Sequence, residues 1–146
     1  MEAKTAMFEK DFVGNLIPQK APFVMVDKMY SYTETSVVSG LTVNEENIFC
    51  SEGKLIESGL IEHMAQTVAL HTGYQFYLKQ EPAPTGYIGS IKEIEIKKLP
   101  KTGDSITTEV NILHEFGGIT LVDITTSLNG EHIASGQMKT VLAKNG

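Results

Sequence analysis

A carboxylate, an imidazole and a carboxamide lie within five consecutive residues of one strongly apolar segment. The stretch EHMAQ, residues 62–66, lies near the start of the run 59–79, which would be apolar on nearly every side of a helix. An unpaired charge buried in such a helix costs several kcal/mol or shifts its pKa toward the neutral form. Such a carboxyl group exchanges protons near neutral pH, so Glu62 is the first candidate for acid–base chemistry.

Two polar neighbours could complete a site around Glu62. The His63 imidazole titrates in the range of a general base, but successive helix residues point about 100° apart. His63 would therefore serve a site only across a subunit interface, and a structural or interface role is the alternative interpretation. Gln66 follows Glu62 by one turn and would either hold its carboxylate or satisfy backbone groups. Gly59, at the helix start, would leave free N–H groups that suit a thioester oxygen.

Other kinds of site have no support in the sequence. The four histidines, at 63, 71, 114 and 132, lack the spacing of a metal motif, and the single cysteine, Cys50, excludes a cysteine-based zinc cluster. No dinucleotide-binding or phosphate-binding glycine loop is present, so we expect no metal and no cofactor. The net charge of −6, without a dense basic patch, argues against nucleic acid as a partner.

Composition indicates an ordinary globular protein. Apolar residues make up 41% and charged residues 21% of 146 residues, which fits one domain with a sizeable core. The N-terminal stretch lacks the apolar core of a secretory signal, and no apolar run approaches the roughly 18 residues of a membrane span. We expect a cytoplasmic protein with one domain over 1–146, in which 1–11 form a loosely ordered N-terminus.

One long helix and six strands are expected to position these residues. A short helical turn over 12–17 would end at Pro18, and the long helix would cover 59–79. The expected strands are 23–30, 36–43, 87–98, 106–114, 119–128 and 132–143. Asn129-Gly130 predicts a tight hairpin between the last two strands, and 44–53 reads as irregular.

The predicted helix has two different faces. One is a stripe with the spacing of buried positions, formed by Leu60, Ile61, Met64, Ala65 and Val68. The other face is formed by Glu62, Gln66, Ala69 and Gly73. Beyond the polar pair Glu62 and Gln66, its side chains are small. This second face would let a neighbouring chain or a thin ligand come close. A helix apolar nearly all round must be wrapped by a sheet, so we expect the α+β class, with an antiparallel four-stranded meander after the helix.

Three motifs resemble, in order, those of the β-hydroxyacyl-acyl-carrier-protein dehydratases, which have the hot-dog fold. LIPQKAPFVMVDKM resembles the family's Leu-Pro-His-Arg-x-Pro-Phe opening, and GYIGSIKEIEIKKLPKTGDSI resembles its strand that ends in Pro-Gly-Asp. EHMAQ resembles Glu-Ala-Met-Ala-Gln, which places the family's catalytic Glu on Glu62. The resemblance covers about 12–143. The helix start is closest to the divergent branch of aryl-polyene and flexirubin pigment clusters, which shows a similar Glu-Tyr-Met-Ala-Gln helix.

One family motif is absent. The Gly-His-Phe-Pro-Gly loop that supplies the catalytic histidine has no counterpart in IFCSEGKLIESG, and Gln19 stands where the first motif usually has His. The resemblance implies a homodimer or higher homo-oligomer with its site between two chains, and an acyl thioester on acyl-carrier protein or coenzyme A as substrate. We predict Glu62 and His63 as catalytic residues, and as substrate contacts Gly59, Gln66, Gly89 and Phe49.

The resemblance implies a lyase, a 3-hydroxyacyl-thioester dehydratase-like protein of fatty acid or polyene-type biosynthesis. Two alternatives stay open. A hot-dog thioesterase would use Glu62 to activate water and would need no separate histidine. A non-catalytic acyl-binding partner subunit would have kept the fold and lost the histidine.

Overall fold

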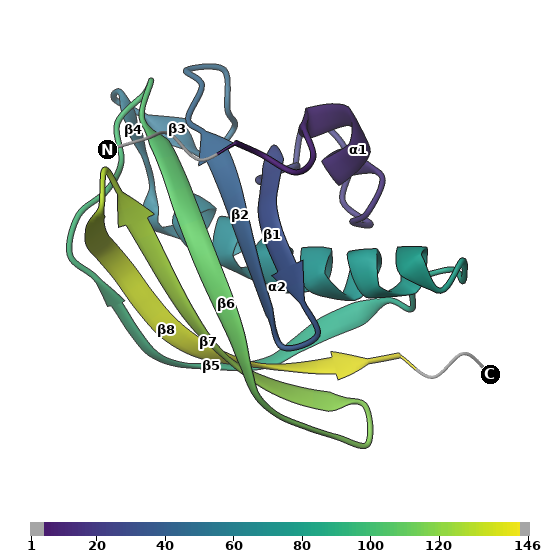
Figure 1. Cartoon of the computed structure of the whole chain (residues 1–146). Helices are drawn as coiled ribbons and strands as arrows, with labels where there is room; N and C mark the ends of the chain where they lie inside the picture. Colours follow the sequence, from purple (N-terminus) through teal and green to yellow (C-terminus); the bar gives the residue numbers. More distant parts are fainter. Residues whose placement is uncertain (1–4, 144–146) are drawn as a thin grey trace.

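One long helix lies against a curved antiparallel sheet in this computed structural model, which describes residues 5–143 (Figure 1). The helix is α2 (Glu57–Leu78), and a short α1 (Lys10–Gly14) precedes the sheet. The strands are β1 (Lys28–Thr33), β2 (Ser36–Thr42), β3 (Cys50–Ser51), β4 (Lys54–Leu55), β5 (Gly86–Ile96), β6 (Ser105–Phe116), β7 (Ile119–Leu128) and β8 (Glu131–Leu142). The predicted α+β class, with a sheet wrapped around one helix, is confirmed.

The six long strands form one sheet in the order β1-β2-β6-β7-β8-β5, and β3 pairs with β4. The predicted four-stranded meander after the helix is wrong in one respect, because β5 pairs with β8, as in Gly86 opposite Leu142, and not with β6. Alternation in a sequence specifies a strand but not its neighbour. The short connection 79–85 after α2 brings β5 to the free edge of β8, and residues 97–104 then lead to the other side of the meander.

Element boundaries agree with the sequence where local patterning decides them. The predicted strand 36–43 is β2 and the predicted strand 119–128 is β7, while α2 begins two residues before the predicted start. The strand expected at 23–30 begins only at Lys28, because the backbone of Phe23 and Met25 is bonded to side chains of α2. The irregular stretch 44–53 holds β3, whose turn into β4 has positive φ at Glu52 and Gly53.

The core lies between α2 and the concave face of the sheet. The predicted buried stripe is confirmed at Leu60, Met64 and Val68, which are at most 7% exposed. Apolar residues of the strands, such as Val110 and Ile124, cover this stripe. Burying one such side chain contributes roughly 1.5–3 kcal/mol, so this contact fixes how α2 rotates against the sheet.

Part of the expected loose N-terminus is ordered against β1. The N–H groups of Met7 and Phe8 donate to Met29 O at 2.7 and 3.1 Å, and the Phe8 ring stacks on Phe12 at 4.3 Å between centroids. Residues 1–4 of that expected segment lie outside the described residues. Within residues 5–143, no helix is both long and apolar enough to cross a membrane.

The loop after α1 rests directly on the second face of α2. A Cβ built on Gly73 would lie 1.8 Å from Leu16 O, so only glycine permits this approach. The small face that the sequence predicted thus receives a segment of its own chain. The contact brings Pro18 and Gln19 close to the helix face that carries Glu62.

Candidate active site

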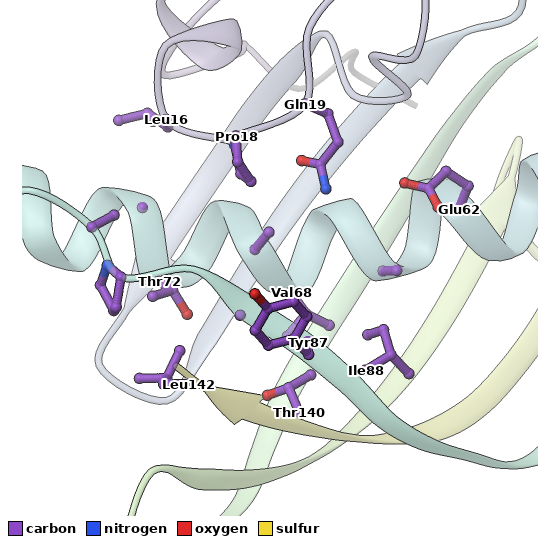
Figure 2. A pocket seen from close by; sticks show the side chains of 16 residues that line it. Leu16, Pro18, Gln19, Glu62, Val68, Thr72, Tyr87, Ile88, Thr140 and Leu142 are labelled. Atoms are coloured by element: carbon purple, nitrogen blue, oxygen red, sulfur yellow. The ribbon is translucent and has the colours of Figure 1, made fainter. Parts of the chain in front are cut away.

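A cavity of about 130 Å³ lies between α2, β5 and the loop that follows α1 (Figure 2). Its walls are mostly apolar or small. The residues of α2 that line it are Glu62, Ala65, Val68, Ala69, Thr72 and Gly73. Figure 2 shows the Glu62 carboxylate at one end of this space, on the same side as the Gln19 carboxamide, with Tyr87 of β5 across from them. Glu62 and Tyr87 are the only lining residues with ionisable side chains.

Gln66 fixes the Glu62 carboxylate by a hydrogen bond. Its Nε2 donates to Glu62 Oε2 at 2.7 Å and to Phe23 O at 2.8 Å, while its Oε1 accepts from the Met25 N–H at 2.6 Å. The Gln66 side chain is fully buried, and every hydrogen of its amide is used. Both interpretations of Gln66 are therefore realised, because it fixes the carboxylate and also satisfies backbone groups.

Gln19 is the residue that sequence reasoning left out of the site. Its Oε1 is shielded from solvent and has no hydrogen-bond partner, the only such side-chain atom among residues 5–143. An unpaired buried acceptor costs about 1–3 kcal/mol, so it is expected to meet a donor in the working protein. The signal in the sequence was its place in the first motif, where the family has His, but only the fold brings this position beside Glu62.

His63 lies in the core and does not line the cavity. Its Nδ1 donates to Met25 O at 2.6 Å, and its Nε2 accepts from the Thr108 hydroxyl at 2.8 Å. Burial lowers the pKa of His63 to about 4, although the bond to Met25 and the charge of Asp27 act in the opposite direction. The ring is neutral at pH 7 and is enclosed by its own chain, so this arrangement does not offer it as a base to a neighbouring subunit.

The other predicted substrate contacts lie beside the cavity or away from it. The free N–H predicted at Gly59 is not found, because this N–H donates to Ile56 O at 3.0 Å. Gly59 instead permits close contact with Phe49, whose Cβ would lie 2.4 Å from a Cβ at this position. Gly89 sits at an irregularity of β5, next to the cavity residue Ile88. In the described part of the chain, no three His, Cys, Asp or Glu side chains gather as metal ligands would.

A family model, two relatives and one solved structure relate this chain to dehydratases. The family model for ApeP-like proteins, ApeP dehydratase, matches residues 12–145. The 3-hydroxyacyl-[acyl-carrier-protein] dehydratase FabZ of Vibrio cholerae is 29% identical over 133 residues, which cover 87% of this chain and 86% of that protein. FabZ of Caldicellulosiruptor bescii is 26% identical over 139 residues, or 90% of this chain and 96% of that protein. A chain of the dehydratase heterocomplex ApeI:P from Xenorhabdus doucetiae superposes with a TM-score of 0.85 at 19% identity, covering 91% of both chains.

Proposed function

The chain belongs to the ApeP-like dehydratase family, and from this premise we propose that it removes water from a 3-hydroxyacyl thioester with Glu62 as its acid–base residue. Its fold is the hot-dog fold, as the sequence predicted. The observation that carries the proposal is the Glu62 carboxylate, which faces an otherwise largely apolar cavity and is held by a fully buried Gln66 at 2.7 Å.

One carboxylate is sufficient for this elimination if it acts twice. The Glu62 carboxylate first removes the proton from C2 of the substrate, and the electron pair of that C–H bond forms the C2=C3 double bond. The C3–O bond breaks, and the departing hydroxyl takes up the proton that Glu62 has just received. The products are an enoyl thioester and water, and Glu62 is again a carboxylate. This route needs no imidazole, and no histidine is among the residues that line the cavity.

Gln19 orients the substrate in this scheme. Its Oε1 is a buried acceptor without a partner, and the 3-hydroxyl of the substrate is a donor. While this hydroxyl donates to Gln19, its oxygen remains free to accept the proton from Glu62. The apolar lining, including Val68 and Leu142, would contact the acyl chain.

The carrier and the assembly belong to the same proposal. We propose acyl-carrier protein or coenzyme A as the carrier, since the FabZ relatives are named for acyl-carrier-protein substrates. We also propose a homodimer, with a related dehydratase chain as the alternative partner because the similar Xenorhabdus doucetiae protein is a heterocomplex. The lone cysteine suits a cytoplasmic location. Membership of the ApeP-like family supports a place in fatty acid or polyene-type biosynthesis.

The cavity itself favours one second candidate, a thioesterase. A single carboxylate without an imidazole could position a water for attack on the thioester carbonyl, releasing the thiol and an acid. The two activities differ in the bond that breaks, which is C3–O in dehydration and C–S in hydrolysis.

The test is to incubate the protein with 3-hydroxyacyl, enoyl and saturated acyl thioesters and to follow dehydration, hydration and thiol release separately. We expect dehydration, a loss of 10²- to 10⁴-fold in Glu62→Gln, and no loss in Glu57→Gln. Glu57 is the matched control because it lies in the first turn of the same helix, is exposed and does not line the cavity. Gln19→Leu should weaken turnover of 3-hydroxyacyl thioesters and leave binding of saturated ones unchanged.

Three results would contradict the proposal in different ways. Thiol release that depends on Glu62 would establish the thioesterase. Binding of acyl thioesters without any reaction would establish a non-catalytic partner subunit. Wild-type turnover in Glu62→Gln, with an unchanged melting temperature, would show that the carboxylate takes no part in the chemistry.

A further inference from the structure

The backbone of Met25 is held from both sides by side chains of α2. His63 Nδ1 donates to its carbonyl at 2.6 Å, and its N–H donates to Gln66 Oε1 at 2.6 Å. Met25 lies outside β1, and its own backbone bonds therefore run to the helix instead of to a neighbouring strand. His63 and Gln66 are three residues apart in a helix, so they present neighbouring positions to this one residue.

The direction of each bond in this group is fixed by chemistry. A carbonyl can only accept, so His63 carries its proton on Nδ1 and its Nε2 accepts from Thr108. A backbone N–H can only donate, so Gln66 turns Oε1 toward Met25 and Nε2 toward Glu62. The orientation of the amide that holds the carboxylate is thus set by the Met25 N–H together with Phe23 O, which accepts from Nε2 at 2.8 Å. The carbonyl of Met25 is held in turn by His63.

We propose that His63 is a positioning residue for Glu62, acting through the Met25 backbone and the Gln66 carboxamide. The inference rests on the proposed role of Glu62 in the reaction. His63 then has a function without contact to substrate. The hydrogen bond of its imidazole to Met25 and the one to Thr108 have different roles. Only the bond to Met25 leads, through Gln66, to Glu62 at the cavity.

The hydrogen bonds that start from the Thr108 side of the His63 ring lead only into the sheet. The Thr108 hydroxyl also bonds Thr126 at 2.6 Å, and both threonines are fully buried. This branch anchors α2 to β6 and β7 and contains no group that contacts Glu62 or Gln66. Removing it is therefore a matched control, because it disturbs the same buried network and the same imidazole while leaving the Met25 bond in place.

Three variants of the full chain separate positioning from general stabilisation. His63→Asn places an amide donor near the former Nδ1 and keeps the bond to Met25. His63→Leu removes both bonds of the ring, and Thr108→Val removes only the Thr108 branch. Each variant is measured for melting temperature, for kcat and KM on the best thioester, and for the side-chain amide signals of Gln66 by nitrogen–proton NMR, assigned with Gln66→Met.

We expect His63→Leu to lower kcat by up to about 10²-fold at nearly constant KM, as for a displaced catalytic group. Its Gln66 amide protons should exchange with solvent faster. His63→Asn should recover kcat to within about threefold of the wild type. Thr108→Val should have a lower melting temperature but keep both the kcat and the protected Gln66 amide signals of the wild type.

Two results would overturn the proposal. One is unchanged kcat and unchanged Gln66 signals in His63→Leu. The other is a loss of kcat in Thr108→Val as large as in His63→Leu. If the wild type turns over no thioester, the proposed function fails, while the exchange of the Gln66 amide still decides whether His63 fixes it.

Discussion

Glu62 and His63 are neighbours in the sequence, but the fold gives them opposite environments. Glu62 is half-buried at a cavity, and His63 is completely enclosed between α2 and the sheet. The 100° step between successive helix residues causes this separation. One helical turn can thus carry both the proposed acid–base residue and the residue proposed to position it.

Acidification should destabilise the protein through His63. Its pKa is about 4 in the folded state against 6.5 for the free side chain, so the unfolded state binds the proton first as the pH falls. The stability that the neutral His63 ring contributes is therefore fully present above pH 6.5. It decreases between pH 6.5 and 4, by on the order of 3 kcal/mol. Burial lowers the pKa of His71 as well, which acts in the same direction.

Urea unfolding at pH 7, 5.5 and 4.5 measures this effect. In His63→Asn the titrating ring is gone, so its stability should change less over this range than that of the wild type. Equal slopes for the two proteins would mean that other groups, such as carboxylates or His71, account for the acid sensitivity.

At the scale of elements, the cavity exists because β5 and the loop after α1 both meet one face of α2. The helix contributes the small residues Ala69 and Gly73, β5 contributes the opposite wall, and the loop after α1 closes one side (Figure 2). Gly73 is the point of tightest contact, since a Cβ there would collide with Leu16 O. The position of Gln19 therefore depends on a glycine in the helix.

Gly73→Ala should destabilise the fold and displace this loop. The added methyl group must push the loop or the helix away, and such overpacking typically costs about 1–3 kcal/mol. Gly14→Ala is the control, because a Cβ at Gly14 would have no atom within 4 Å. We expect urea unfolding to show a lower midpoint only for Gly73→Ala, and thioester turnover to fall with it. Equal midpoints would show that the loop adapts freely.

At the scale of the whole molecule, the exposed edge of the sheet points to assembly. β5 is an edge strand of 11 residues, and it exposes the apolar side chains Tyr87, Ile88 and Ile91. Long apolar edge strands tend to pair with another chain unless they are protected. Because β5 also lines the cavity, a partner on this edge would lie next to the proposed site.

We expect the protein to be at least a dimer, which light scattering at micromolar concentration would distinguish from the 16.0 kDa monomer. Ile91→Lys should shift it toward the monomer by placing a charge on the edge. Ile119→Lys is the matched control, because Ile119 has the same 44% exposure but lies on an interior strand. A wild-type monomer, or dissociation by the control variant alone, would contradict an interface at β5.

The sequence by itself determined the local features and their family. The spacing of apolar residues identified α2 and its buried stripe, alternation identified the strands, and the motif around Glu62 selected that residue. These signals are local, because helix and strand periodicity is repeated every few residues. The place of β5 in the sheet was not determined, since its pattern is compatible with either neighbour.

Only the tertiary structure decided how the site is built. The bond between Met25 and Gln66 joins residues 41 positions apart, and Gln19 approaches Glu62 only because the loop after α1 rests on Gly73. The burial that lowers the pKa of His63 likewise depends on strands distant in the sequence. Hydrogen-bond partners and desolvation are properties of assembled surroundings, so residue type and spacing proposed the candidates, and the fold assigned Glu62 to the cavity and His63 to the core.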